Sequence, residues 1–159
     1  MGGVHASRGG LMTQFLPKPT SVAEIARNVL VGQDYVFAMK EFIDTLLYDL
    51  KAKGVITLDL PVPYPAAAFE VEPPYLESPR SRAHLAGMAE HLAVTSGQPV
   101  PAWVEKPIYF LAEPFYIGGK SSRDRTVAET PPAFSRRLLF CGRVLTKLPA
   151  FFQRPAVEQ

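Results

Sequence analysis

Apolar residues recur at intervals of three and four along three stretches of the chain, and the first stretch follows Ser21. Ser21 with Glu24 three residues later forms a capping-box pattern, which is typical of a helix N-terminus. Gly32 stands where the pattern stops, as a glycine does that ends a helix. The spacing predicts a helix over 21–32. Its apolar stripe consists of Val22, Ile25, Ala26 and Val29.

A second and longer helix is predicted over 34–54, with Asp34 as the N-cap and Gly54 as the stop. Its apolar face consists of Val36, Met39, Ile43, Leu46, Leu47 and Leu50. Three aromatic residues widen this face: Phe37, Phe42 and Tyr48. A face of this width predicts cover on more than one side, by the core and by a second copy of the chain.

The third helix leads to the single tryptophan, Trp103. Ser81 is the expected N-cap and Gly97 the expected stop, and the stripe between them is Leu85, Met88, Ala89 and Leu92. Prolines at 99 and 101 restrict the backbone beyond the helix, so Trp103 is carried on a stiff arm. Two interpretations stay open: a tryptophan that fills the core, and an exposed anchor for a partner.

The remaining segments predict short elements joined by extended chain. Residues 61–79 hold six prolines and read as a strap laid over the helices, with a proline-rich ligand for another protein as the alternative. Residues 55–60 predict a short edge strand, and 138–141 a buried strand. Short helices are expected over 122–129 and 133–137. A last helix is expected to include Val144, Leu145 and Leu148.

Length and composition favour one mainly α-helical domain, an irregular bundle with proline-rich connections and at most a minor strand pair. The chain has 159 residues and 16 prolines, about twice the average usage. We expect a flexible tail over 1–16 and the domain over 17–155. The lone Cys141 gives no disulfide or metal-binding pair, and no apolar run is long enough for a membrane span, so a cytoplasmic location is expected.

Charge is distributed unevenly along the chain. Residues 1–79 hold six Lys and Arg against nine Asp and Glu, a net −3, whereas residues 80–159 hold eleven against six, a net +5. A positive surface formed by the second half suits an acidic partner, and its alternative use is contact with DNA or RNA. The residues expected to contact nucleic acid under that alternative are Lys120, Arg123, Arg125, Arg143 and Lys147.

His84, Glu90 and His91 are the only compact set of candidate metal ligands or acid–base groups. The two histidines lie seven residues apart, about 10 Å along a helix, which is too far for one zinc ion. We therefore expect each ring to satisfy a nearby backbone carbonyl, with no metal and no cofactor. A small metal- or histidine-dependent enzyme remains the third alternative.

Two further motifs have ordinary structural interpretations. The sequence GGKSS at 118–122 resembles the end of a phosphate loop, but Pro114 occupies the position of the required first glycine. Cys141 lies near Arg143, which favours a thiolate, yet a small buried hydrophobic residue is the usual role of a free cysteine. Neither motif predicts catalysis.

Three segments resemble a set of uncharacterised bacterial proteins that share a helix, a proline–alanine–tryptophan elbow and a proline–phenylalanine–arginine–arginine turn. They are VFAMKEFIDTLLY (36–48), HLAVTSGQPVPAWVEKP (91–107) and ETPPAFSRRLLF (129–140). The resemblance implies a small regulatory or antitoxin-like protein encoded beside other genes, and brings no catalytic residue with it.

These observations together predict a non-catalytic protein that binds another protein, such as a toxin encoded nearby, and that self-associates. Large aromatic side chains and arginines dominate the energetics of such contacts. The expected partner-binding residues are Trp103, Tyr109, Phe115, Tyr116, Arg136 and Arg137.

Overall fold

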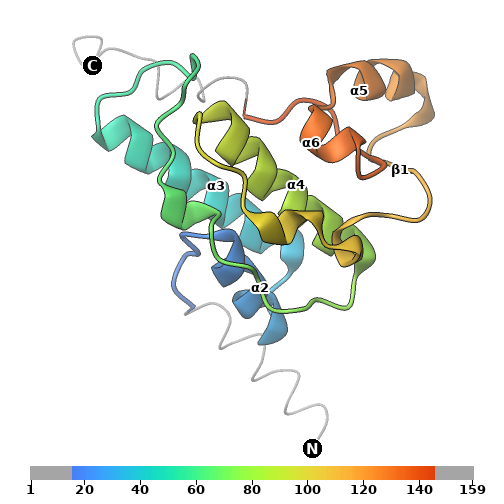
Figure 1. The fold of residues 1–159 in the computed structure, drawn as a ribbon, viewed down its shortest axis with the longest axis horizontal. Coiled ribbons are helices and arrows are strands. Elements are labelled where there is room, and N and C mark those ends of the chain that lie inside the picture. The colour runs from blue at the N-terminus through green and yellow to red at the C-terminus, as the bar shows by residue number, and fades with distance from the viewer. Residues whose placement is uncertain (1–15, 146–159) are drawn as a thin grey trace, which may run out of the picture.

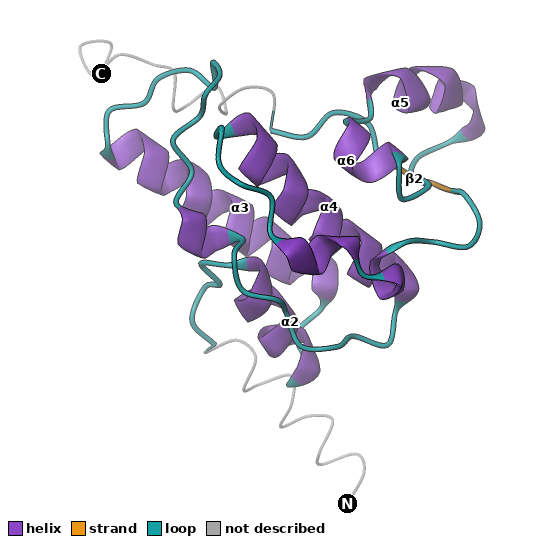
Figure 2. Ribbon diagram, in the orientation of Figure 1, coloured by secondary structure: helices purple, strands orange, loops and turns teal. Residues whose placement is uncertain are grey.

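Three helices form the body of the protein: α2 (Val22–Leu30), α3 (Tyr35–Ala52) and α4 (Pro79–Thr95). The computed structural model describes residues 16–145, and Figure 1 shows α4 running alongside α3, with α2 below them. Helices and loops make up nearly all of the described chain, with a single pair of very short strands (Figure 2). The predicted mainly helical fold class is confirmed.

The N-caps of the first two helices are those that the sequence predicts. The Ser21 hydroxyl accepts the backbone N–H of Glu24 at 3.1 Å, and the Asp34 carboxylate accepts that of Phe37 at 3.0 Å. The third N-cap is wrong by three residues, because α4 begins at Pro79 and is capped by Ser78. Proline suits the first turn of a helix, where its missing N–H leaves no bond unmade.

The core is apolar and centred on α3 and α4. All four residues of the predicted α4 stripe are buried, and so are Met39, Phe42, Leu46, Leu47 and Leu50 of α3. The predicted α3 face is wrong at Val36, which is 73% exposed in the first turn of the helix. Phe37 and Tyr48 are also exposed, on the outer side of α3.

The proline-rich segment 61–79 packs on the body as a strap, with one 3-10 turn, η1 (Ala66–Ala68). Of its three aromatic residues, Tyr64 and Phe69 are buried and Tyr75 is exposed. The strand expected over 55–60 is absent from the described structure, where these residues form bends and loop. Two 3-10 turns follow α4: η2 (Ala102–Glu105) and η3 (Pro107–Tyr109).

A smaller C-terminal unit, residues 111–145, packs against α4 and stands to one side of the body (Figure 1). Its elements are β1 (Phe115–Tyr116), η4 (Lys120–Ser122), α5 (Arg123–Glu129), α6 (Pro132–Ser135) and β2 (Leu139–Phe140). The two strands pair in parallel, with Phe115 opposite Leu139 and Tyr116 opposite Phe140.

The C-terminal elements match the sequence-based expectations in part. The short helix at 122–129 and the strand within 138–141 are confirmed as α5 and β2, and the helix expected over 133–137 begins and ends earlier as α6. Val144 and Leu145 lie in a loop, and Leu148, the third residue expected in a last helix, falls outside the described residues. Within 16–145, no helix has both the length and the apolar character needed to cross a bilayer.

Candidate interaction site

Trp103 and Tyr109 lie inside the protein, where they hold the strap to the body. Trp103 is 8% exposed and donates its indole N–H to the carbonyl of Glu70 at 3.2 Å. Tyr109 is 2% exposed and donates its hydroxyl to the Glu72 carboxylate at 2.8 Å. The two rings meet edge to face at 5.1 Å. Of the two interpretations of Trp103, this placement supports the core residue, and it removes both side chains from the accessible surface.

Arg137, expected to bind a partner, is fully buried against α4 and α6 and is therefore not accessible at the surface. Its guanidinium donates to the Glu90 carboxylate at 2.7 Å and to the backbone carbonyls of Ala133 and Val104. The Nε atom has no hydrogen-bond partner. Burial raises the pKa of Glu90, but hydrogen bonds from Arg136 and Arg137 outweigh it and hold the pKa below its ordinary value. Arg137 is therefore a structural cation.

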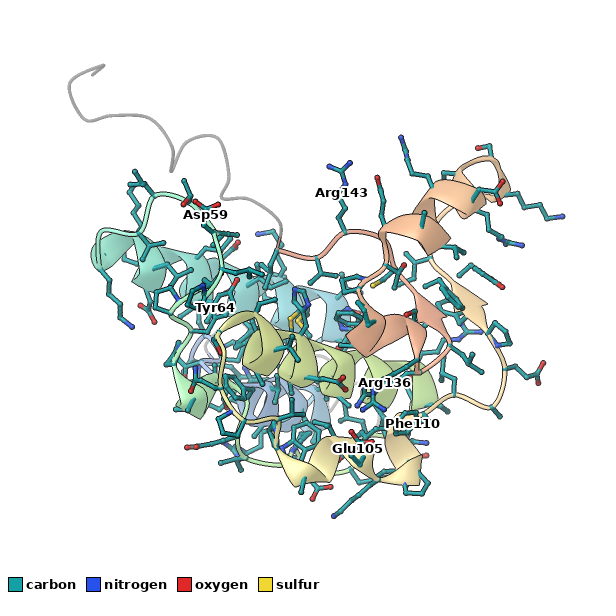
Figure 3. The ribbon with its side chains drawn as sticks, turned by 45° about the horizontal axis from the view of Figure 1, so that its top comes forward. Asp59, Tyr64, Glu105, Phe110, Arg136 and Arg143 are labelled. Carbon is teal, nitrogen blue, oxygen red and sulfur yellow. The ribbon has the colours of Figure 1, made fainter. Side chains whose placement is uncertain are left out.

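Arg136 lies at the surface, beside the position of Arg137. It donates to both oxygens of Glu90 at 3.0 Å and also binds Glu105, so it bridges α4, α6 and η2. Its guanidinium stands 5.1 Å from the ring centre of Phe110. Figure 3 shows Arg136, Phe110 and Glu105 gathered at one place on the molecule. The carboxylates that pair with Arg136 belong to this chain.

Phe115 and Tyr116 are adjacent in β1, and successive residues of a strand point to opposite faces. The Arg80 guanidinium lies 3.6 Å from the ring centre of Phe115, and the Arg123 guanidinium lies 4.3 Å from that of Tyr116. Such contacts are attractive because the face of an aromatic ring carries partial negative charge. The strand thus divides the predicted aromatic cluster between two surfaces.

The surface on the Phe115 side contains a groove of about 630 Å³ between the start of α4 and the chain that leads into β1. We call it the Arg80 groove. The backbone bulges here, because the N–H groups of Leu111 and Phe115 donate to the neighbouring carbonyls of Arg137 and Leu138. The lining residues are Ser78, Pro79, Arg80, Leu111, Ala112, Glu113, Pro114 and Phe115. The groove combines an apolar floor with one cation and one anion.

The opposite surface carries the residues of the nucleic-acid alternative. Tyr116 stacks on Phe140 with ring centres 5.1 Å apart and planes 15° apart, and Arg123 covers the stack. Lys120 and Arg125 are exposed nearby on η4 and α5. The other two predicted cations, Arg143 and Lys147, are not grouped with them.

Arg143 donates to Glu129 at 3.0 Å, so its charge is partly compensated. Lys147 lies outside the described residues. Of the five predicted cations, the structure places Arg123 against the Tyr116 stack and leaves Lys120 and Arg125 exposed on η4 and α5.

The candidate histidine set is dispersed along α4. His84 is half-buried and its ring lies 2.6 Å from the Tyr35 hydroxyl, while His91 is half-buried and bonded to the backbone of Val144. Glu90 is engaged by the two arginines. Within residues 16–145, no three His, Cys, Asp or Glu side chains are grouped as metal ligands. The backbone bond of His91 is of the predicted kind, whereas the partner of His84 is a hydroxyl.

The two remaining motifs lie in unremarkable surroundings. Cys141 is half-buried, and burial raises the pKa of its thiol to about 11, which disfavours the thiolate at neutral pH. The GGKSS motif contains the single turn η4 and ends at Ser122, the residue before α5. A thiol that stays protonated at neutral pH, as that of Cys141 does, is a poor nucleophile.

Sequence reasoning missed Arg80, Phe110 and Phe140, which the fold brings against the predicted residues. Arg80 lies in the first turn of a helix, and neither periodicity nor a motif distinguishes it there. Its role depends on the return of the chain at Phe115, 35 positions later.

Comparisons with family models, with curated proteins and with solved structures found no match to this chain.

Proposed function

We propose that this protein is a non-catalytic binder of another protein, an inhibitor or antitoxin-like regulator, and that the Arg80 groove is the contact site. The observation that carries the proposal is the groove itself, where an arginine lies over an aromatic ring in a lining that also contains apolar side chains. Aromatic and arginine side chains dominate the binding energy of protein interfaces.

The absence of an ion pair at Arg80 within the described part of the chain supports its use as a contact for a partner protein. Arg80 is exposed and takes part in none of the ion pairs found among the described residues. Stacking on Phe115 orients the guanidinium without using its N–H donors, so these remain available for a carboxylate. A partner segment with an apolar side chain next to an acidic one fits this chemistry.

The proposal is tested by affinity capture with the full chain as bait. Arg80→Ala is expected to reduce recovery of the specific partner at least fivefold, which corresponds to about 1 kcal/mol for an interface arginine. Arg125→Ala is the matched control, because it removes the same charge from an exposed position in α5. Equal recovery with wild type and Arg80→Ala would contradict the proposed site.

A second candidate function is DNA or RNA binding, favoured by the Tyr116–Phe140 stack that Arg123 covers, in a unit that also carries the exposed cations Lys120 and Arg125. Proteins that bind single strands combine stacking aromatic rings with a positive surface. Under this alternative, Arg125→Ala weakens retention on DNA and Arg80→Ala does not. Retention must also fall steeply as salt rises.

Self-association through α3 is part of the proposal. Phe37 and Tyr48 are 48% and 64% exposed and lie eleven residues apart, about three helical turns, on the outer side of the helix. We expect Phe37→Glu or Tyr48→Glu to convert an oligomer into a monomer in light-scattering measurements. The control is Ile56→Glu, at an exposed position outside α3.

A further inference from the structure

The contact between α4 and α6 depends on a glycine. A Cβ atom at Gly87 would lie 2.5 Å from Cδ1 of Phe134, closer than a real Cβ atom approaches another atom. Phe134 is fully buried and therefore occupies a notch that only glycine leaves open on α4. This ring is the principal apolar link between α6 and the body.

Two histidines flank the notch, one turn before it and one turn after it. The ring centre of Phe134 lies 5.4 Å from that of His84 and 6.1 Å from that of His91. His84 is held from the other side by the Tyr35 hydroxyl of α3, and His91 is bonded to the backbone of Val144. Both imidazoles therefore touch the groups that hold the C-terminal unit in place.

Protonation of His84, His91 or Glu90 would weaken this contact in the same sense. On α4, Glu90 supplies the only carboxylate between the histidines, and Arg136 and Arg137, which follow α6, both bind it. Arg136 also binds Glu105 of η2. Tyr35, from α3, is neutral, and burial raises its pKa further. Protonation of either histidine adds positive charge to a contact that already contains two arginines, and protonation of Glu90 weakens the carboxylate that both arginines share.

We propose that the contact of Phe134 with Gly87, His84 and His91 is an acid-sensitive latch, which releases α6 and β2 from α4 as the pH falls below neutral. The body is not released, because α2, α3 and α4 meet through apolar side chains. The inference concerns this chain alone, so its outcome is separate from that of the proposed function.

The direction of the pH dependence follows from the pKa of His84 in the closed and the open latch. Burial lowers the pKa of His84 from 6.5 to about 4 when the latch is closed, and the ordinary value returns when it opens. The open state then binds more protons, so closure is favoured fully above about pH 6.5 and progressively less as the pH falls toward 4. Between pH 7 and pH 5 this histidine lowers the ratio of closed to open molecules by at most about 20-fold.

Hydrogen exchange of the full chain measures the opening directly. The amides of residues 134–140 report on the latch, since the N–H groups of Phe134, Arg137 and Leu138 donate to the carbonyls of Pro131, Phe134 and Ser135 in and beside α6. After correction for the intrinsic exchange rates at each pH, we expect their protection to fall up to 20-fold from pH 7 to pH 5. Protection in α2 and α3 is expected to stay constant over this range.

His84→Gln identifies the group responsible, because glutamine can still bond the Tyr35 hydroxyl but does not titrate. We expect this variant to lose most of the pH dependence, and Tyr35→Phe, which leaves the histidine in place, to keep it. Wild-type protection over 134–140 that is independent of pH would overturn the latch. So would an equal loss in all helices, which is global acid unfolding, or an unchanged pH dependence in His84→Gln.

Discussion

The body and the C-terminal unit are held by different forces. In α4 eight residues are buried, all apolar, alanine or glycine, whereas α5 of the C-terminal unit buries none. The unit is fixed instead by Phe134, by the buried Arg137 and by arginines stacked on Phe115 and Tyr116. Apolar burial does not depend on pH, whereas charged contacts depend on pH and are screened by salt. The comparison therefore separates a constant scaffold from a part that can respond to conditions.

Phe42→Ala should have the largest effect on stability. Phe42 is fully buried in α3, and truncation of such a residue removes transfer free energy and leaves a cavity, at about 3–5 kcal/mol. We expect the midpoint of urea unfolding to fall for the body and the C-terminal unit together. Val36→Ala, at an exposed position in the same helix, is the control. A loss below about 1 kcal/mol would contradict a core centred on α3.

Arg137→Met should have the second largest effect, a loss of stability of about 3 kcal/mol. The change leaves Glu90 with only one arginine, and it leaves the carbonyls of Ala133 and Val104 without a donor. Urea unfolding measures the loss. The control is Arg143→Met, which breaks an exposed ion pair and should cost no more than about 0.5 kcal/mol. Equal effects of the two variants would mean that burial of the cation does not matter.

Gly87→Ala should destabilise the protein by about 1–3 kcal/mol, the cost of overpacking, although alanine is the better helix former. The new methyl group collides with Phe134. Phe134→Leu in the same chain should relieve the collision, so the double variant should lose less than the two single losses added together. Additive losses in thermal unfolding would show that the notch is not shared between these residues.

Ser78→Ala should have the smallest effect, about 1 kcal/mol, because it removes the N-cap of α4 and leaves the backbone N–H of Ser81 without its acceptor. Helix α4 belongs to the body, so thermal unfolding should shift as one transition. Ser81→Ala is the matched control, since only its backbone N–H takes part in that bond. If Ser81→Ala cost as much as Ser78→Ala, the sequence-based cap would be the correct one.

The elements of the body were predictable because their cause is local. Periodic apolar residues and side-chain caps predict α2 and α3, and Gly97 ends α4 with a φ of 69°, a left-handed conformation that suits glycine. The start of α4 was misplaced because Ser78 and Ser81 are both acceptable caps. The choice depends on Pro79, which favours the first helical position.

The candidate site was less predictable, because its parts come from distant positions. Residue type alone suggested Trp103 and Tyr109 as anchors, but their polar atoms reach Glu70 and Glu72 of the strap and hold both rings inside. Nothing local marks Arg137 as buried, since its acceptors lie on α4, η2 and α6. Tertiary contacts decide the exposure of such side chains, and a single sequence does not display those contacts.

A heteronuclear NMR spectrum of Arg137→Met tests most directly whether the body stands independently of the charged contacts. If the two regions are held by different forces, amide signals of α2, α3 and the first half of α4 keep their wild-type positions, while those of residues 111–145 shift or broaden. If signals throughout the body move or collapse together with those of the C-terminal unit, the two regions form one cooperative structure and the account is contradicted.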